Sequence, residues 1–192
     1  MFRFLKKLVA KLRLRSKAKA KAKKTKKKPS PPRRRHSFDS RTKKNLDTLH
    51  PKVRDTFIAL TEIAMAVGRK YGVTIKMISA HRSIEEQKKL YAKGRYGNPG
   101  PIVTTVKVSR HCFQIAADYG CFGENGKYLD GSNPTLTSKI YTEIYKRAVK
   151  ESLPIIHGGT WKSFPDFPHF EYKNNLSIAQ MKEIVRKGQE VV

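Results

Sequence analysis

Cysteine is scarce in this sequence, which has only Cys112 and Cys121 in 192 residues. Their separation of nine residues fits neither a C-x-x-C redox pair nor a common zinc-knuckle spacing. We interpret both as buried free thiols, and one disulfide stays open if the protein acts in an oxidising compartment. The cysteines therefore indicate neither a redox motif nor a metal motif.

Long apolar runs are also missing. No segment approaches the roughly 18–20 apolar residues that a membrane span needs, or the about 7–15 that an export signal needs. Within residues 1–15, the apolar side chains are interrupted by Lys6, Lys7, Lys11 and Arg13. The sequence thus predicts neither a transmembrane helix nor a standard signal peptide. A role outside the cytoplasm would require another delivery route.

Acidic residues are absent from the first 36 positions, which hold 17 of the 42 lysines and arginines. This tail supplies most of the formal net charge of +27. Like charges at such density keep a chain extended unless a polyanion neutralises them. We therefore expect the folded part to begin after the tail, near Phe38.

Two segments differ within the tail. Residues 1–15 alternate apolar and basic side chains at helical spacing, which is typical of a cationic amphipathic helix on an anionic membrane surface. A disordered basic arm is an equally valid interpretation. Residues 16–37 are rich in lysine, arginine and proline and predict a stiff, solvated linker. The expected anion-binding side chains are Lys6, Lys7, Lys11, Arg13 and Arg15.

The folded domain is predicted at residues 38–192. Residues 51–71 place apolar side chains on one face of a helix, with Pro51 in the first turn and Gly72 just past the end. A second helix should follow Ser83, because Glu86 completes a capping box, and its Leu90 and Tyr91 should point inward.

The remaining pattern mixes helices and strands without a regular βαβ repeat. This arrangement predicts an α+β fold, a small antiparallel sheet flanked by helices. Further helices are expected at 138–152 and 177–187, and strands at 73–79, 102–108, 114–120, 153–156 and 169–172.

Two histidines and an aspartate are candidate metal ligands: His111, Asp118 and His169. A turn near residues 112–113 must bring the first two together, because seven residues separate them and strand side chains alternate. Two imidazoles and one carboxylate make a complete catalytic zinc set that leaves a position for water. Asp166 is placed to take the proton of that water. Either aspartate also suits an ordinary loop cap, so spacing alone leaves this assignment open.

The residues around these ligands resemble a known family. Ser-x-His-x(6)-Asp, followed far downstream by Asp-x-x-His, is similar to the signature of the D-alanyl-D-alanine carboxypeptidase/L-alanyl-D-glutamate endopeptidase family of zinc peptidases. The endopeptidase branch, which includes phage endolysins, is the closer match. The resemblance covers about residues 38–172 and extends to the segments at 80–83, 158–164 and 168–171.

This resemblance implies a role for each motif residue. It assigns one zinc ion, at the face of the sheet, to the three ligands named above, and the role of catalytic base to Asp166. It assigns contacts with substrate carboxylates or carbonyls to Arg82, Gln87 and Ser109, and a guanidinium suits such contacts through bidentate pairing. Gln114 and His81 depart from the family, which usually has glycine and commonly tyrosine there; the departures bear on substrate fit and efficiency, because neither removes a ligand.

Other side chains near the motifs have more than one interpretation. We interpret His157 as a pocket or structural residue, and Trp161 and Phe164 as packing residues rather than substrate-stacking ones. Glu171 shares the strand face of His169, where it is either a supporting partner of that ligand or an exposed strand residue.

The function that the resemblance implies is cleavage of the L-alanyl–D-glutamate bond in peptidoglycan stem peptides by a monomer. One alternative is a D-alanyl-D-alanine carboxypeptidase, and another is a polyanion- or envelope-binding protein with a degenerate peptidase domain. The tail would bind an anionic membrane or lipopolysaccharide; specific nucleic-acid binding is not expected, because residues 16–35 contain no aromatic side chain for base stacking. An endolysin made in the host cytoplasm and acting at the cell wall during lysis fits the missing export signal.

Overall fold

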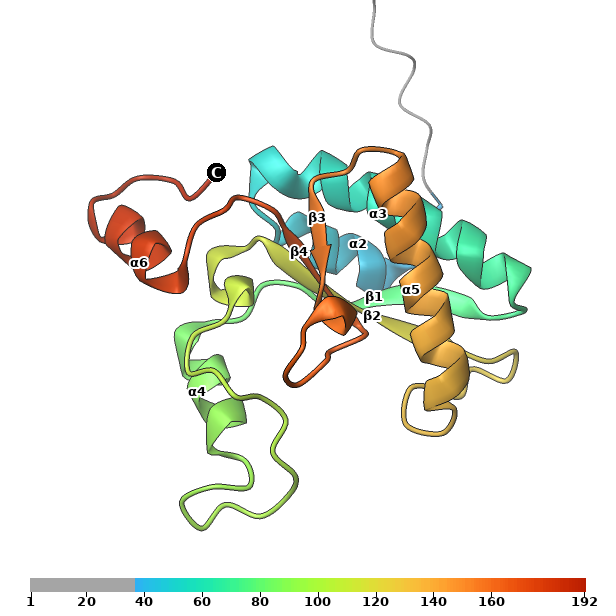
Figure 1. Cartoon of the computed structure of the whole chain (residues 1–192), viewed down its shortest axis with the longest axis horizontal. Coiled ribbons are helices and arrows are strands. Elements are labelled where there is room, and N and C mark those ends of the chain that lie inside the picture. Colours follow the sequence, from blue (N-terminus) through green and yellow to red (C-terminus); the bar gives the residue numbers. More distant parts are fainter. Residues whose placement is uncertain (1–36) are drawn as a thin grey trace, which may run out of the picture. The chain divides into compact units, whose positions relative to one another are not determined.

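The structure is a computed structural model that describes residues 37–192 (Figure 1). The predictions for residues 1–15 and for nearly all of the 16–37 linker concern positions outside the described residues. Within the described part, the predicted α+β class with a small antiparallel sheet and flanking helices is confirmed. None of the described helices is long and apolar enough to cross a membrane.

The sheet places two of the predicted ligands side by side. Its strands are β1 (Thr74–Ser79), β2 (Ala116–Phe122), β3 (Ile155–His157) and β4 (His169–Tyr172). They pair antiparallel in the order β1-β2-β4-β3, so β2 and β4 are central. In this register Asp118 of β2 lies opposite His169 of β4. Residues about fifty positions apart thus become neighbours on the two central strands of the sheet.

One face of the sheet packs against α3 (Pro51–Lys70) and α5 (Pro134–Lys150). Tyr119 and Phe170, from the two central strands, are fully buried there with ring centroids 5.6 Å apart. The Tyr141 hydroxyl of α5 donates to the Tyr119 carbonyl at 2.9 Å. Because strand side chains alternate between faces, the neighbouring residues of β2 and β4 project from the opposite face.

A short helix that the sequence pattern did not predict, α2 (Ser40–Asp47), covers the outer edge of β1. Its Asn45 amide donates to the Met77 carbonyl at 2.9 Å, and the Thr42 hydroxyl accepts from the Met77 backbone N–H at 3.2 Å. These side chains satisfy groups that an edge strand would otherwise present for pairing. The helix lacks a clear periodic signal because Thr42 and Leu46 are its only buried residues.

Capping residues set most helix boundaries as predicted. Ser83 begins α4 (Ile84–Ala92) and Ser177 begins α6 (Ile178–Arg186), each through a complete capping box. The long helix α3 also begins and ends where its proline and glycine predicted. Only α5 differs, since it begins four residues before the predicted start because Asn133 caps it. Local hydrogen bonds, rather than apolar periodicity, fix these ends.

The strand predicted at residues 102–108 is wrong, because this segment is irregular and pairs with no strand of the sheet. Two side chains donate hydrogen bonds to its backbone carbonyls: the Gln87 amide to Val106 at 2.8 Å, and the Arg95 guanidinium to Thr104 at 3.1 Å. β-Branched residues favour a strand only where a partner and a packed face exist. In this protein the segment instead forms one side of a cavity.

The strand predicted at 114–120 begins two residues later, because Gln114 has left-handed backbone angles. The strand predicted at 153–156 is likewise shifted, to Ile155–His157. Both cysteines are free as predicted, although only Cys121 is buried and Cys112 is half-buried. Burial raises the pKa of the Cys121 thiol to about 12, so this thiol is unreactive at neutral pH.

Candidate metal centre

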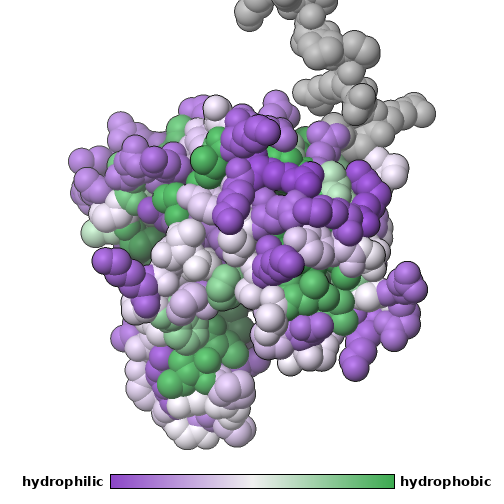
Figure 2. Space-filling view, turned by 45° about the vertical axis from the view of Figure 1, so that its right-hand side comes forward, coloured by the Kyte–Doolittle hydropathy of each residue, from purple (hydrophilic) through white to green (hydrophobic). Residues whose placement is uncertain are grey.

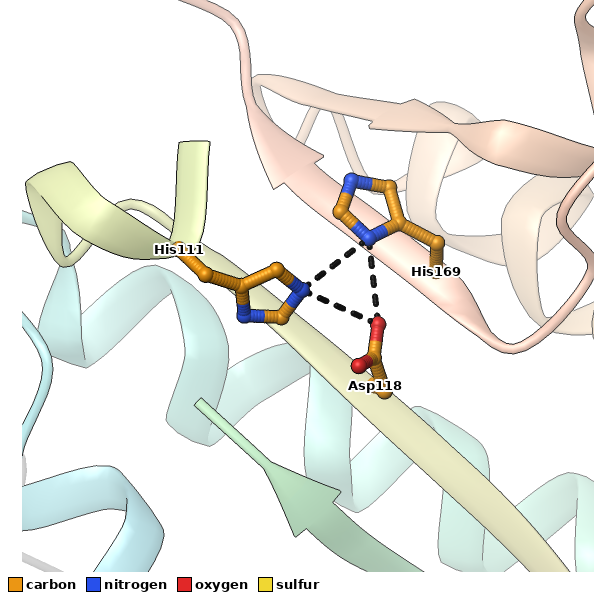
Figure 3. Close-up of side chains that lie close together, drawn as sticks. All are labelled: His111, Asp118 and His169. Carbon is orange, nitrogen blue, oxygen red and sulfur yellow. Dashed lines mark hydrogen bonds and ion pairs between the residues drawn. The ribbon is translucent and has the colours of Figure 1, made fainter. Parts of the chain in front are cut away.

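Three side chains converge on the face of the sheet opposite α3 and α5 (Figure 3). His111 Nε2 lies 3.1 Å from Asp118 Oδ1 and 3.2 Å from His169 Nδ1. His169 Nδ1 lies 3.0 Å from the same Asp118 oxygen. The three atoms therefore form a nearly equilateral triangle, and both histidines are almost fully buried.

A short turn brings His111 to the sheet, as its spacing from Asp118 predicted. Residues Arg110–Phe113 form the 3₁₀ turn η1, and the Ser109 side chain accepts from the His111 backbone N–H. The turn ends at Gln114 with φ of +60° and ψ of +28°. This left-handed residue reverses the chain into β2, so that His111 and Asp118 face each other. The position that is usually glycine in the family thus has a backbone conformation that favours glycine.

Each histidine has its second ring nitrogen engaged by an acceptor. His111 Nδ1 contacts the Ala80 carbonyl, and His169 Nε2 lies 3.2 Å from Glu171 Oε2. A carbonyl or an ionised carboxylate only accepts, so each of these nitrogens carries the proton. In the neutral form of each ring, which is the form that binds metal, the opposite nitrogen directs its lone pair toward Asp118. Three lone-pair donors that converge in this way are stabilised by a cation between them.

The charges in the centre agree with this interpretation. Burial opposes ionisation of Asp118, but interactions with His111 and His169 hold the pKa of this carboxyl well below its usual range. Burial likewise opposes protonation of His169, but hydrogen bonds with Asp118 and Glu171 raise its pKa to about 10. Both shifts arise because the carboxylates and the imidazoles stabilise each other's charged forms.

The donor set fits zinc. Ligand distances of about 2.0–2.2 Å in a tetrahedral site place neighbouring ligand atoms about 3.3–3.6 Å apart. The three observed separations of 3.0, 3.1 and 3.2 Å are slightly shorter than this range. Two neutral imidazoles and one carboxylate are also the ligand types of catalytic zinc sites. The residues present can therefore hold one zinc ion and leave a further coordination position toward the cavity.

Asp166 lies beside the three ligands without joining them. It sits on the loop before β4, where its backbone N–H donates to the Gly158 carbonyl at 3.1 Å and its carbonyl accepts from the His169 N–H at 3.2 Å. A Cβ at Gly158 would lie 2.5 Å from the Asp166 carbonyl oxygen, so only glycine permits this approach. Burial and the nearby charge of Asp118 raise the pKa of the Asp166 carboxyl.

Of the three predicted substrate-binding residues, Arg82 and Ser109 line the cavity next to the metal centre. Gln87 does not line it: the fully buried Gln87 amide accepts from Arg82 Nη1 at 2.8 Å. Arg82 Nη2 also lies 3.5 Å from Asp118 Oδ2. The residues predicted to point inward from α4, Leu90 and Tyr91, are only half-buried, because Gln87 occupies the inner face.

The cavity has a volume of about 450 Å³ and lies between two chain segments. Residues 103–109 form one side, and the loop of residues 161–166 forms the other. Figure 2 shows hydrophobic side chains on the lobe that α4 and the loop after it build. Trp161 and Phe164, interpreted above as packing residues, are 37% and 48% exposed and line this cavity. They are thus exposed at the cavity rather than packed in the core.

His157 and Glu171 are both buried. His157 stacks on Phe170 with ring centroids 4.6 Å apart, and its Nε2 lies 2.8 Å from the Phe167 carbonyl, so it is structural. Glu171 is only 7% exposed and contacts His169, which makes it a supporting partner rather than an exposed residue. His81, the other departure from the family, is exposed.

Comparisons with known proteins agree with the motifs. Residues 103–172, which contain all three candidate ligands and Asp166, match the family described as D-alanyl-D-alanine carboxypeptidase. The peptidoglycan L-alanyl-D-glutamate endopeptidase CwlK of Bacillus subtilis (strain 168) is 29% identical over 130 residues, which are 64% of this chain and 72% of that protein.

Two solved structures are similar to this one. The Serratia marcescens L-Ala D-Glu endopeptidase ChiX is 23% identical with a TM-score of 0.48, over 70% of this chain and 88% of that one. The vancomycin resistance D,D-pentapeptidase VanY of the VanB-type cassette, solved with Zn(II), is 15% identical with a TM-score of 0.41, over 74% and 81% of the two chains.

A His–Asp–His triangle beside a cavity can hold a metal ion, which is the arrangement that metal-dependent hydrolases use. Within that class, residues 103–172 resemble the D-alanyl-D-alanine carboxypeptidase family, and the relative CwlK is a peptidoglycan L-alanyl-D-glutamate endopeptidase.

Proposed function

We propose that this protein is a peptidoglycan endopeptidase that hydrolyses the L-alanyl–D-glutamate bond of stem peptides, with His111, Asp118 and His169 as its zinc ligands. The observation that carries the proposal is the triangle of three ligand atoms, 3.0 to 3.2 Å apart, beside an open cavity. The choice of bond is supported by the names of CwlK and ChiX, both L-alanyl-D-glutamate endopeptidases.

In this proposal, zinc and Asp166 have separate roles in hydrolysis. Zinc, when bound, polarises the scissile carbonyl and lowers the pKa of water. Asp166 accepts the proton of the attacking water on its carboxylate and returns it to the amine of the leaving D-glutamate. Its raised pKa suits this exchange, because the carboxylate must both take and release a proton.

Arg82 and Ser109 would orient the substrate. Both face the cavity, and a guanidinium can pair with a substrate carboxylate through two parallel hydrogen bonds. Gln87 would act through Arg82, because the Gln87 amide oxygen accepts a hydrogen bond from Arg82 Nη1 at 2.8 Å. An Arg82→Lys variant should therefore raise KM more than it lowers kcat, because lysine keeps the charge without the planar fork.

We further propose that the protein is an endolysin, delivered to the cell wall by a separate pore protein, and that its cationic tail concentrates it on an anionic envelope. The composition of residues 1–36, with 17 basic and no acidic residues, supports this. Deleting these residues should weaken lysis of whole cells far more than digestion of purified wall. Equal losses in the two assays would contradict the role of the tail.

Mass spectrometry of purified peptidoglycan, after incubation with zinc-loaded protein, tests the activity. The expected products are stem peptides that begin at D-glutamate, with L-alanine left on the glycan. Release of free D-alanine alone would instead establish a D-alanyl-D-alanine carboxypeptidase, the activity named in the matched family. No product from the wild type would favour a degenerate peptidase domain. The Asp166→Asn protein is the matched control, because it keeps every proposed metal ligand.

A further inference from the structure

A largely buried ion pair lies beside the metal centre, at the lining of the cavity. Arg110 Nε lies 3.0 Å from Glu171 Oε1, and the other carboxylate oxygen, Oε2, lies 3.2 Å from His169 Nε2. The Arg110 and Glu171 side chains are only 17% and 9% exposed. The carboxylate therefore bridges a guanidinium and the imidazole of a candidate ligand.

The remaining donors of Arg110 reach past the part of the chain that matches the family. Its Nη1 donates to Asn174 Oδ1 at 2.8 Å, and its Nη2 donates to the Leu176 carbonyl at 2.7 Å. The Asn174 amide in turn donates to the carbonyl of Val191 at 3.1 Å. A continuous set of hydrogen bonds thus joins His169 to the C-terminal segment, residues 174–192, while the family match ends at residue 172.

These hydrogen bonds can orient His169 as a metal ligand. An imidazole binds metal through one nitrogen, and the partner of its other N–H fixes both the tautomer and the ring orientation. Glu171 accepts from Nε2, so Nδ1 is free to face Asp118 and His111. A buried carboxylate without a partner would be costly, and Arg110 supplies the compensating charge.

We propose that Glu171 and Arg110 are positioning residues of the metal centre: Glu171 holds the tautomer of His169, and Arg110 holds Glu171 and ties the centre to the C-terminal segment. The inference rests on the metal site of the proposed function. It differs from that function in predicting zinc affinity rather than any activity on peptidoglycan.

The two ligand histidines differ in this respect. His111 is held by a backbone carbonyl, that of Ala80, which no substitution removes. His169 is held by a side chain, so its support can be deleted. Glutamine at position 171 can offer its oxygen to only one of two donors, His169 or Arg110, and its NH₂ group must then face the other. Either choice breaks the set while side-chain volume is kept.

The decisive experiment compares zinc dissociation constants, measured by chelator competition, for the wild type and Glu171→Gln. We expect the constant to rise about 10- to 100-fold. Glu143→Gln is the matched control, because Glu143 also pairs with two cations, Lys70 and Arg147, but on α5 and outside the cavity lining. It should leave zinc affinity unchanged. Thermal unfolding of both metal-free variants separates general destabilisation from loss of the metal.

A second variant keeps the test valid if the first folds poorly. Arg110→Met combined with Glu171→Gln removes both charges and leaves no unpaired ion; it should also lose about 10- to 100-fold in zinc affinity. Wild-type zinc affinity in both proteins would overturn the inference and leave the proposed function standing. A wild type that binds no zinc would overturn the proposed metal site and this inference together.

Discussion

The two faces of the sheet are built from the same strands but differ in chemistry. On the helix-covered face, Tyr119 and Phe170 are fully buried among apolar side chains. On the other face, Asp118 and His169, each one position away along its strand, form the metal centre. Because side chains alternate between the two faces of a strand, packing of the core on one face also fixes the position of the polar site on the other. That site contributes little apolar packing of its own. The comparison predicts that changes on the two faces will have separable effects.

The largest expected effect is on the open face and concerns activity alone. Asp166→Asn should lower kcat/KM about 10²- to 10⁴-fold, because the amide cannot accept the proton. Zinc content and the unfolding midpoint should stay near wild type, whereas His111→Ala should lose both zinc and activity. An Asp166→Asn protein with near-normal kcat/KM would remove this residue from the role of base.

On the helix-covered face, the expected effect is on stability. Phe170→Ala should lower the free energy of unfolding by about 3–5 kcal/mol, because it leaves a cavity between β4 and the helices. Trp161→Ala is the matched aromatic comparison on the open face; because Trp161 is 37% exposed, it should lower the free energy of unfolding less than Phe170→Ala does. Urea denaturation of the two metal-free variants measures the difference, and equal losses would contradict the comparison.

The acid limb of the pH profile gives an effect of intermediate size. Activity requires ionised Asp166, and burial with the charge of Asp118 raises the pKa of Asp166. As the pH falls, kcat/KM should therefore decline at a higher pH than an ordinary aspartate, with a pKa of about 3.9, would give. In the Asp166→Asn variant the residual rate should lack this limb. A limb that persists in the variant would assign the titration to another group.

The smallest expected effect is at Gln114, the left-handed residue between η1 and β2. Gln114→Gly should raise the free energy of unfolding by roughly 0.5–1 kcal/mol, because the strain of a left-handed residue outweighs the flexibility that glycine adds to the unfolded chain. Gln114→Ala keeps the strained geometry and should bring no gain. Thermal unfolding of the three proteins tests this order.

Local sequence signals predicted much of the fold. Ser83 with Glu86, and Ser177 three residues before Gln180, identify helix starts through hydrogen bonds that involve only neighbouring residues. The resemblance identified the candidate ligands, and the register of β2 with β4 brings two of them together. These features could be read because each depends on a short stretch of chain or on a shared motif.

Long-range contacts explain what could not be predicted. The β-branched run at 102–108 has the composition of a strand, but whether a strand has a partner is decided by distant residues. Arg110 is similar: its place in the Ser-Arg-His motif was visible, yet its partners Asn174 and Leu176 lie more than 60 residues away. Exposure of Trp161 at the cavity likewise depends on how its loop folds back.

The irregular segment at 102–108 has a consequence for how such an enzyme can diversify. It borders the cavity, yet side chains of Gln87 and Arg95 hold it, and the sheet pairs with none of it. Substitutions or insertions there reshape one wall of the cleft while every rung of the β-ladder stays intact. The segment is therefore an exchangeable part, through which selection or an engineer can retune substrate preference without rebuilding the catalytic scaffold.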